Sequence, residues 1–292
     1  MDDLLAEHAA KGVGVSLPSL RVDAFSVGLA DKVHQVRKSG LTFAPEAGTQ
    51  RLRDVINKGV TEEEIVEAAT AAAIAGWSSI KLYFIIGLPG ETMEDVAGIA
   101  ETAKLILRSA KAARPADSRK PFSVSVSVAS FIPKPQTPFQ WQGQQTREQL
   151  LAKQEYLRTL FKKVKGARLS CHELDLSFLE AAFSRGDRRL GKVLLTAWQN
   201  GCKFDGWREH FDRETWLQAF ETCGLAPEWY AQRELAKTDV LPWQHISSGV
   251  TKQWLWREWE KAQAAMVTPC CRNHPCSGCG VCMGLDLSLI HI

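Results

Sequence analysis

The stretch that most constrains the fold is IKLYFIIGLPGET, residues 80–92. Its first half is an apolar run that ends in Gly and Pro, as in a strand buried inside a parallel sheet. Gly87 and Gly90 permit backbone conformations that a side chain would obstruct, and the acidic residues after Thr92 suit a helix N-terminus. We therefore predict a strand that turns directly into a helix. Such turns hold ligands in many α/β proteins, although an ordinary strand-to-helix turn explains the same residues.

Residues 1–160 alternate strand-like and helix-like patterns. The predicted strands cover residues 14–17, 41–43, 80–86 and 122–131, and the predicted helical stretches cover 22–39, 48–76 and 92–113. Crossovers of this length imply a parallel sheet. A complete eight-fold barrel needs roughly 250 residues. We therefore predict an α/β fold: a partial (βα) TIM-like barrel, truncated at its N-terminus, with a helical C-terminal extension and a Cys-rich tail.

Charge and cysteine content exclude several classes of protein. The net charge of +3 argues against a global field that would attract nucleic acid or an anionic membrane. The N-terminus MDDLLAEHAAK does not resemble a signal peptide, and no apolar run is long enough to span a bilayer, so we expect a cytoplasmic protein. Five of the eight cysteines fall within residues 270–282, which favours a metal site over disulfides.

Two loops offer polar groups at the ends of predicted strands. In FAPEAGTQR, Glu46 follows the strand directly; its carboxylate could accept hydrogen bonds from a sugar or cap the following helix. The sequence Asn57-Lys58-Gly59 is expected to close that helix. The loop IPKPQTPFQW is too rich in proline to continue a strand. It is predicted to be a rigid plug or one wall of a pocket.

Taken together, FAPEAGTQRLRDVINKG, IKLYFIIGLPGET and SFIPKPQTPFQW resemble the later strands of the radical S-adenosylmethionine (radical SAM) superfamily. The resemblance is closest to the branch that includes methylthiotransferases and an uncharacterised family with a cobalamin-binding-like N-terminal domain. It extends through SRGDRRL, WQNGCKFDGW, LPWQHISSGVTK and the cysteine tail.

This resemblance implies that the chain binds S-adenosylmethionine. The implied cofactor-binding residues are Glu46, Gly48, Thr49, Arg51, Lys81, Gly87 and Ser130. Glu46 would bind the ribose or the amino group, and the backbone around Ser130 would face the adenine. Lys81 and Arg21 could pair with a carboxylate, or could simply be solvated surface residues. No catalytic residue is assigned.

The chain differs from the family in the cysteine motif that binds the iron-sulfur cluster. The superfamily's Cys-x3-Cys-x2-Cys loop, which holds a [4Fe-4S] cluster, does not occur before Cys171. We therefore expect that the chain is the C-terminal part of a larger enzyme and is inactive alone. In the intact enzyme the resemblance implies a 5′-deoxyadenosyl radical that abstracts hydrogen from a substrate. That substrate, RNA or a small molecule, is not identified by the sequence.

Residues 161–265 are predicted to be a tryptophan-rich helical extension without strands. The helical segments are expected at 174–182, 189–200, 213–223 and 251–265. In SRGDRRL, residues 184–190, the arginines could clamp a phosphate or carboxylate, or could form an internal ion-pair network. His172, Asp205 and His245 could contact substrate or transfer protons, or could be hydrogen-bonded structural groups.

The tail CCRNHPCSGCGVC lies in a Cys-rich segment, residues 266–284. Its preferred metal ligands are Cys271, Cys276, Cys279 and Cys282, with Cys270 or His274 as substitutes. The spacing suits an auxiliary iron-sulfur cluster or zinc. Residues 285–292 are interpreted as a non-native tail.

Two other functions are compatible with the sequence. One is a non-catalytic RNA-binding module with a zinc knuckle. The other is a metal-independent barrel enzyme that works through Glu46 and a lysine.

Overall fold

The computed structural model describes residues 41–114 and 120–284. These residues form two compact units that interleave along the chain. Within the described residues, the first unit contains 41–86, 90–114, 120–129 and 152–172, and the second contains 87–89, 130–151 and 173–284. The predicted strand at 14–17, the predicted helical stretch at 22–39 and Arg21 lie outside the described residues. The predicted limits of the domains remain a proposal.

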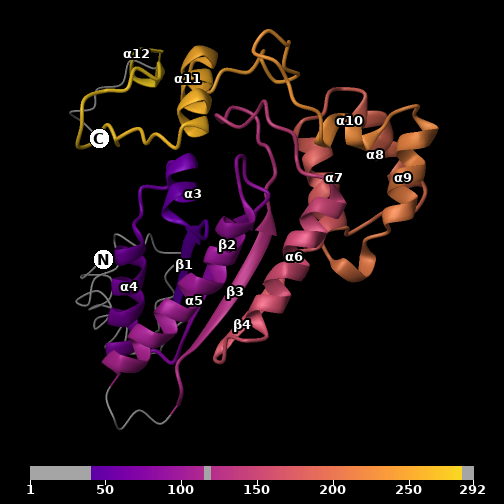
Figure 1. Ribbon diagram of the computed structural model, residues 1–292. Coiled ribbons are helices and arrows are strands. Elements are labelled where there is room, and N and C mark those ends of the chain that lie inside the picture. Colours follow the sequence, from indigo (N-terminus) through magenta and orange to yellow (C-terminus); the bar gives the residue numbers. More distant parts are fainter. Residues whose placement is uncertain (1–40, 115–119, 285–292) are drawn as a thin grey trace, which may run out of the picture. The chain divides into compact units, whose positions relative to one another are not determined.

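The first unit is built on a four-stranded sheet in the order β1-β2-β3-β4 (Figure 1). Its strands are β1 (Leu41–Glu46), β2 (Ser79–Ile86), β3 (Ser123–Ser130) and β4 (Ala167–Cys171). Strand β1 pairs with β2 in parallel, as β3 does with β4. The parallel α/β architecture predicted from the sequence is therefore confirmed, and it is consistent with a partial barrel.

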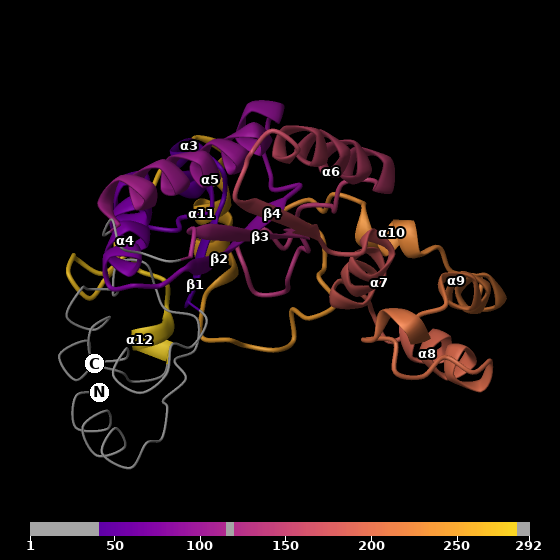
Figure 2. The ribbon, with the colours of Figure 1, turned by 90° about the horizontal axis from the view of Figure 1, so that it is seen from below.

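Helices cover the sheet of the first unit. These are α3 (Gln50–Val55), α4 (Glu62–Ile74), α5 (Met93–Ala113) and the second half of α6 (Arg147–Phe161). Figure 2 shows α5 and α6 on the same side of the sheet. Alternate residues of β1 and β2, including Phe43, Leu82 and Phe84, are almost completely buried, whereas their neighbours are less so. This alternation is the two-residue period of a strand with one well-covered face.

Local sequence sets where the long helices begin. Thr61 with Glu64, and Thr92 with Asp95, each form a capping box at the start of α4 and α5. In both pairs the threonine side chain accepts the third helical N–H, and the acid accepts the N–H of the threonine. The predicted helix start after residue 92 is confirmed.

One expectation was wrong. Strands were predicted to be absent from residues 161–265, but Ala167–Cys171 forms β4. Its sequence, ARLSC, is short and of mixed polarity, so no two-residue hydrophobic pattern marks it. The strand lies at the edge of the sheet and is held by its parallel ladder with β3, from Val124 opposite Ala167 to Val128 opposite Cys171. Tertiary pairing therefore decides its conformation.

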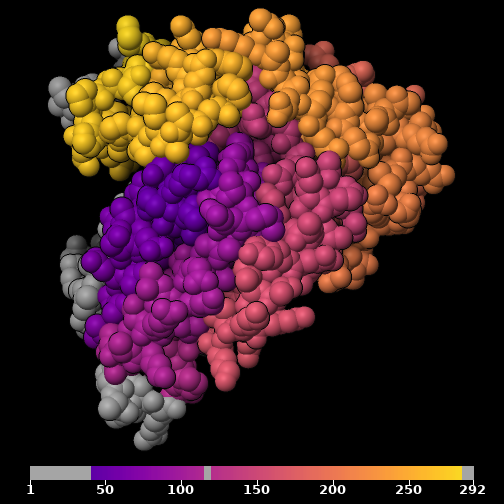
Figure 3. Space-filling view, viewed as in Figure 1, coloured from indigo at the N-terminus to yellow at the C-terminus, as the bar shows by residue number. Residues whose placement is uncertain are grey.

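The second unit is helical after residue 173, as predicted. Its helices are α7 (Leu174–Ser184), α8 (Leu190–Gln199), α9 (Arg213–Thr222), α10 (Pro227–Ala231), α11 (Lys252–Gln263) and α12 (Val281–Gly284), with a 3-10 turn at Arg208–His210. The surface over α8 to α10 is orange in Figure 3. Trp216, Phe220 and Tyr230 belong to one apolar cluster, and Trp141 and Trp243 belong to another. Among the described residues, no helix is long and apolar enough to cross a membrane.

Candidate functional site

Glu46 stands at the carboxyl end of β1 in an unusual backbone conformation. Its φ is 68°, a left-handed value that glycine adopts freely and glutamate rarely does. The ladder with β2 is irregular between Phe43 and Glu46, which lets the chain turn away from the sheet. Non-glycine residues held in this conformation are concentrated at functional sites. The backbone conformation of Glu46 is therefore consistent with a functional role in addition to its place in strand β1.

Among the described residues, Lys58 is the charged partner of the Glu46 carboxylate. Lys58 Nζ lies 3.1 Å from Glu46 Oε1, and each side chain is about one quarter exposed, at 28% and 25%. In the described part of the chain, no hydrogen bond is recorded for the second carboxylate oxygen of Glu46. A partly exposed carboxylate oxygen at this edge can accept a hydrogen bond from a hydroxyl or ammonium group of a ligand.

Gly48 lies against helix α5. A Cβ atom at Gly48 would stand 2.2 Å from the Asp95 carbonyl oxygen and 2.5 Å from the Ile99 nitrogen. Gly98 meets it from the helix, where a Cβ would stand 2.5 Å from the Gly48 carbonyl oxygen. In this structure, Gly48 therefore allows the turn after β1 and the backbone of α5 to pack in direct contact.

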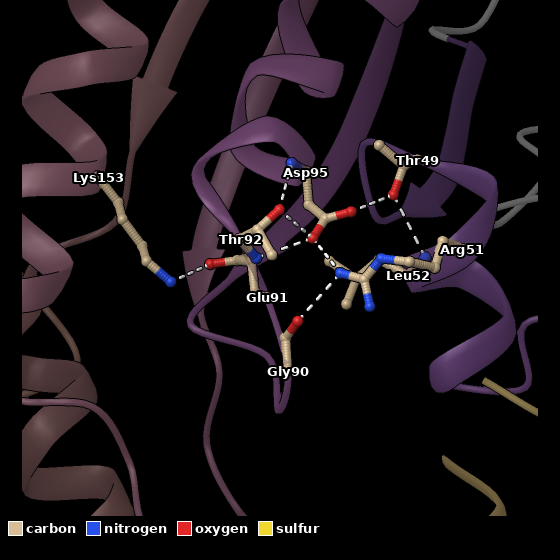
Figure 4. A network of polar contacts seen from close by, with 8 residues as sticks. All are labelled: Thr49, Arg51, Leu52, Gly90, Glu91, Thr92, Asp95 and Lys153. Carbon is tan, nitrogen blue, oxygen red and sulfur yellow. Dashed lines mark hydrogen bonds and ion pairs between the residues drawn. The ribbon is translucent and has the colours of Figure 1, made fainter. Parts of the chain in front are cut away.

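Thr49 and Arg51 both donate hydrogen bonds to the carboxylate of Asp95 (Figure 4). Arg51 also donates to the carbonyl oxygen of Gly90 at 3.0 Å. Asp95 in turn accepts from the backbone N–H and the hydroxyl of Thr92, each at 2.8 Å. The structure brings Thr49 and Arg51 together, and both side chains are engaged within the protein.

The network lowers the pKa of Asp95. Burial alone would raise that pKa, but hydrogen bonds from Thr49, Thr92 and Arg51 outweigh the effect of burial. The Asp95 side chain is only 3% exposed. Asp95 is therefore an ionised, buried acid that ties the turn after β1 to the start of α5.

A second buried charge pair lies beside this network. Lys153 from α6 forms an ion pair with Glu91, and the two side chains are 9% and 1% exposed (Figure 4). Both residues belong to the first unit. The pair links α6 to the segment before α5. Separating the two side chains would leave a buried charge without this partner, which is costly.

Lys81 does not lie at this edge. It pairs in register with Thr42, whereas Glu46 lies level with Phe84. Lys81 is therefore three residues, roughly 10 Å, further back along β2. Its ammonium group sits 4.7 Å from the centre of the Tyr83 ring. The structure does not bring Lys81 together with Glu46.

Gly87 and Ser130 belong to the second unit. Gly87 follows β2 with φ of 81°, and a Cβ there would stand 2.7 Å from Leu150 Cδ2. Ser130 is the last residue of β3, and its buried hydroxyl has no hydrogen-bond partner among the described residues. Gln145 Oε1 is likewise buried and unpartnered there. Since buried polar groups are nearly always paired, a ligand or water can complete these contacts.

The other polar candidates have mostly structural contacts. His172 Nε2 lies 3.4 Å from the Ser127 hydroxyl, and its backbone extends the pairing with β3. Asp205 accepts a hydrogen bond from the indole of Trp216 at 3.0 Å. His245 is exposed. These contacts agree with the structural alternative that the sequence left open for His172 and Asp205.

The cysteine tail forms a loop that is anchored to the start of α11. Thr251 N–H donates to the Cys279 carbonyl oxygen at 2.9 Å, and Gly278 N–H donates to Cys276 Sγ at 3.4 Å. Within residues 41–114 and 120–284, however, no three Cys, His, Asp or Glu side chains are arranged to hold a metal ion. Metal binding by Cys271, Cys276, Cys279 and Cys282 therefore stays a prediction.

Comparison with known families identifies the first part of the chain. Residues 3–103 match the family model described as the radical SAM superfamily. Residues 3–103 belong to the radical SAM superfamily. This radical SAM segment includes Glu46, Lys58 and the Asp95 network. The superfamily resemblance inferred from the sequence is confirmed, and the narrower relationship to methylthiotransferases remains a prediction.

A relative was found in an archaeon. An uncharacterised protein of Methanocaldococcus jannaschii is 31% identical to this chain over 183 residues. The aligned part is 63% of this chain and 37% of the relative. The chain thus spans little more than a third of the length of that relative.

Sequence reasoning missed the roles of Asp95, Lys58 and Lys153 at the site. Thr92 and Asp95 have the three-residue spacing of a capping box, which could have marked Asp95 as a buried acceptor. Lys58 was assigned to a helix end, although it pairs with Glu46 across 12 residues. Lys153 lies 62 residues from Glu91, and no local pattern marks it as a partner.

Proposed function

We propose that this chain is part of a radical SAM enzyme and that Glu46 binds S-adenosylmethionine. The observation that carries the proposal is the Glu46 carboxylate at the end of β1. It has a left-handed backbone, a lysine partner in Lys58 and a second oxygen that can accept a hydrogen bond. The residue lies inside the segment that belongs to the superfamily.

The donor set around Glu46 fits this cofactor. The Glu46 carboxylate, which is paired with Lys58, can accept from the ribose hydroxyls or from the amino group of S-adenosylmethionine. Lys58 then restricts the orientation of the carboxylate by binding one of its oxygens. S-adenosylmethionine, together with a [4Fe-4S] cluster, supplies the radical chemistry in this superfamily, and the protein supplies orientation.

Thr49 and Arg51 have a different role in this proposal. Both side chains bind Asp95, so we assign them to positioning the turn after β1. Gly48 serves the same purpose by letting that turn contact α5. A ligand at Glu46 would then meet a turn that is already ordered, which reduces the entropy lost on binding.

Three further residues keep proposed contacts with the cofactor or the substrate. Gly87 would let backbone approach the cofactor, and the segment around Ser130, with its unpartnered hydroxyl, would face the adenine. Lys81 is proposed to meet a carboxylate group away from Glu46, on the less buried face of β2. The residues described here do not assemble a cluster-binding set, so we derive no step through the [4Fe-4S] cluster.

Calorimetric titration of the purified chain with S-adenosylmethionine tests the proposal. We expect binding by the wild type and roughly tenfold weaker binding by Glu46→Gln, since a charge-assisted hydrogen bond is lost. Glu63→Gln removes an exposed acid from α4 and is the matched control. Equal affinity in Glu46→Gln would contradict the assignment. If the folded wild type does not bind S-adenosylmethionine but binds RNA with an affinity that depends on salt, the RNA-binding module is favoured.

A further inference from the structure

The second unit contains a buried arginine whose hydrogen bonds are incomplete. Arg185 follows the end of α7 and is only 3% exposed. Its Nη1 donates to the carbonyl oxygens of Tyr230 at 2.8 Å and of Ala231 at 3.1 Å, which links α7 to α10. Its Nε and Nη2 atoms are also buried, and neither has an acceptor in the part of the chain that is described.

These unpaired atoms are the side of the guanidinium that suits an oxyanion. The Nε–H and one Nη2–H point in nearly the same direction, so they can donate two parallel hydrogen bonds. Carboxylate and phosphate groups accept this fork in a bidentate manner. The backbone carbonyls of α10 occupy the other side of Arg185 and fix the orientation of the fork.

Among the described residues, no acid forms an ion pair with Arg185. Asp187, the acid nearest in sequence, is held by Arg189, whose Nη2 lies 2.7 Å from Asp187 Oδ2. Burial, and then the like charge of Arg233, lower the pKa of Arg185 to about 10, so it is still a cation at neutral pH. A buried charge is normally paired. Within the described residues, the group nearby that perturbs Arg185 electrostatically is a second cation.

Arg233 extends the positive site toward the surface. Its guanidinium carbon lies 3.4 Å from the centre of the Trp229 ring, and the corresponding atom of Arg189 lies 5.4 Å from that ring. Trp229 is 43% exposed. The charge of Arg233 also acts on Asp187 and Tyr230. Its N–H groups make no hydrogen bond within the described residues, so they can donate to a ligand.

We propose that Arg185 and Arg233 form a binding site for an oxyanion, either a phosphate or a carboxylate group of a ligand. The proposal is independent of S-adenosylmethionine binding at Glu46. An oxyanion here supplies both features that Arg185 lacks among the described residues: two acceptors for its fork and a negative charge. The free donors of Arg185 are enclosed, so binding includes a local displacement of the side chains that cover them.

The test titrates the full chain with sodium phosphate and, separately, with sodium acetate, each against sodium chloride at equal ionic strength. We expect one of these oxyanions, or both, to bind with measurable heat and to raise the unfolding temperature, whereas chloride does neither. Preference for phosphate or for acetate identifies which group the site takes. If neither binds more strongly than chloride, the proposal is overturned, and buried water completes the contacts of Arg185.

Three variants locate the site. Arg185→Lys keeps the charge but loses the fork, so oxyanion affinity is expected to fall roughly tenfold. Arg233→Gln is expected to lower the affinity for the oxyanion several-fold. This variant tests the site even if Arg185→Lys does not fold. Arg188→Gln removes an exposed arginine from the same segment, and it should bind as the wild type does. Unchanged affinity in Arg233→Gln, or equal loss in Arg188→Gln, would reject the site in favour of general charge attraction.

Discussion

The hydroxyl of Thr49 donates a hydrogen bond to the carboxylate of Asp95, 46 residues further along the chain. The same threonine caps α3, since its oxygen accepts from the Leu52 N–H at 3.3 Å. Asp95 likewise caps α5 through Thr92. One contact therefore joins the first turns of two helices at the end of β1. The turn after β1 should therefore be ordered by Asp95. In the proposed function, a ligand at Glu46 binds beside this ordered turn.

Replacement of Asp95 by asparagine should destabilise the chain at neutral pH. The variant replaces one acceptor oxygen of Asp95 by an NH2 group and removes the negative charge that Arg51 contacts, for which we expect a loss of about 2–4 kcal/mol in the free energy of unfolding. Urea unfolding at pH 7 measures this loss. Glu67→Gln, which changes an exposed acid on α4, should have almost no effect.

The contribution of Asp95 should also depend on pH. Its folded pKa is below the unfolded value of about 3.9, so the folded state binds this proton less readily than the unfolded state does. The stabilisation is present above the unfolded value and is lost as the pH falls through the folded pKa. The difference in unfolding free energy between wild type and Asp95→Asn should therefore shrink as the pH falls from about 5 through the unfolded value of about 3.9 and below it. A difference that stays constant over this range would contradict an ionised Asp95.

A single methyl group at Gly48 should disturb the packing of α5. Because the added Cβ would overlap backbone atoms of Asp95 and Ile99, neither of which can rotate away, Gly48→Ala should cost about 1–3 kcal/mol. Gly191→Ala in α8 adds the same methyl group where no atom lies within 4 Å. That control should be neutral or stabilising by up to about 1 kcal/mol. Thermal unfolding of the two variants provides the comparison.

Loss of Lys153 should remove the cation that pairs with the buried Glu91 carboxylate. Lys153→Met is expected to cost about 3–5 kcal/mol, and adding Glu91→Gln should recover part of that loss. Lys104 and Glu101 form a more exposed pair on α5, at 31% and 63% exposure. Lys104→Met should therefore cost less than about 1 kcal/mol. Similar losses for Lys153→Met and Lys104→Met in chemical denaturation would argue against a buried pair at Glu91.

The cysteine tail should retain metal after anaerobic reconstitution. We expect bound iron with sulfide, or zinc, in the wild type, and its loss in the Cys276→Ala, Cys279→Ala double variant, because these thiolates are proposed ligands. Metal and sulfide analysis distinguishes the two metals. Cys202→Ala, which removes a buried thiol from the apolar cluster of the second unit, is the control that should keep the metal. Equal metal content in all three proteins would show that the tail is not the site.

Local sequence was sufficient to predict the elements that are determined by residues close together in the chain. The strand β2, the turn after it and the start of α5 were predicted because an apolar run, two glycines and acidic residues suited to a helix N-terminus follow one another closely. Helices α7, α8, α9 and α11 of the second unit were predicted from their apolar spacing, whereas the short helices α10 and α12 were not. Glu46 was recognised as a candidate because it directly follows a strand. The superfamily itself could be inferred from three short motifs in the first half of the chain.

Tertiary structure decided what depends on partners far apart in the sequence. The five residues of β4 become a strand because β3 supplies their hydrogen bonds. Thr49 and Arg51 were expected to meet a cofactor, yet Asp95 binds both, because packing at Gly48 and Gly98 brings the start of α5 to the turn. Arg185 was known from sequence only as part of a charged segment. Its burial against the carbonyls of α10, which leaves a fork of donors unpaired, arises from the packing of helices more than 40 residues apart.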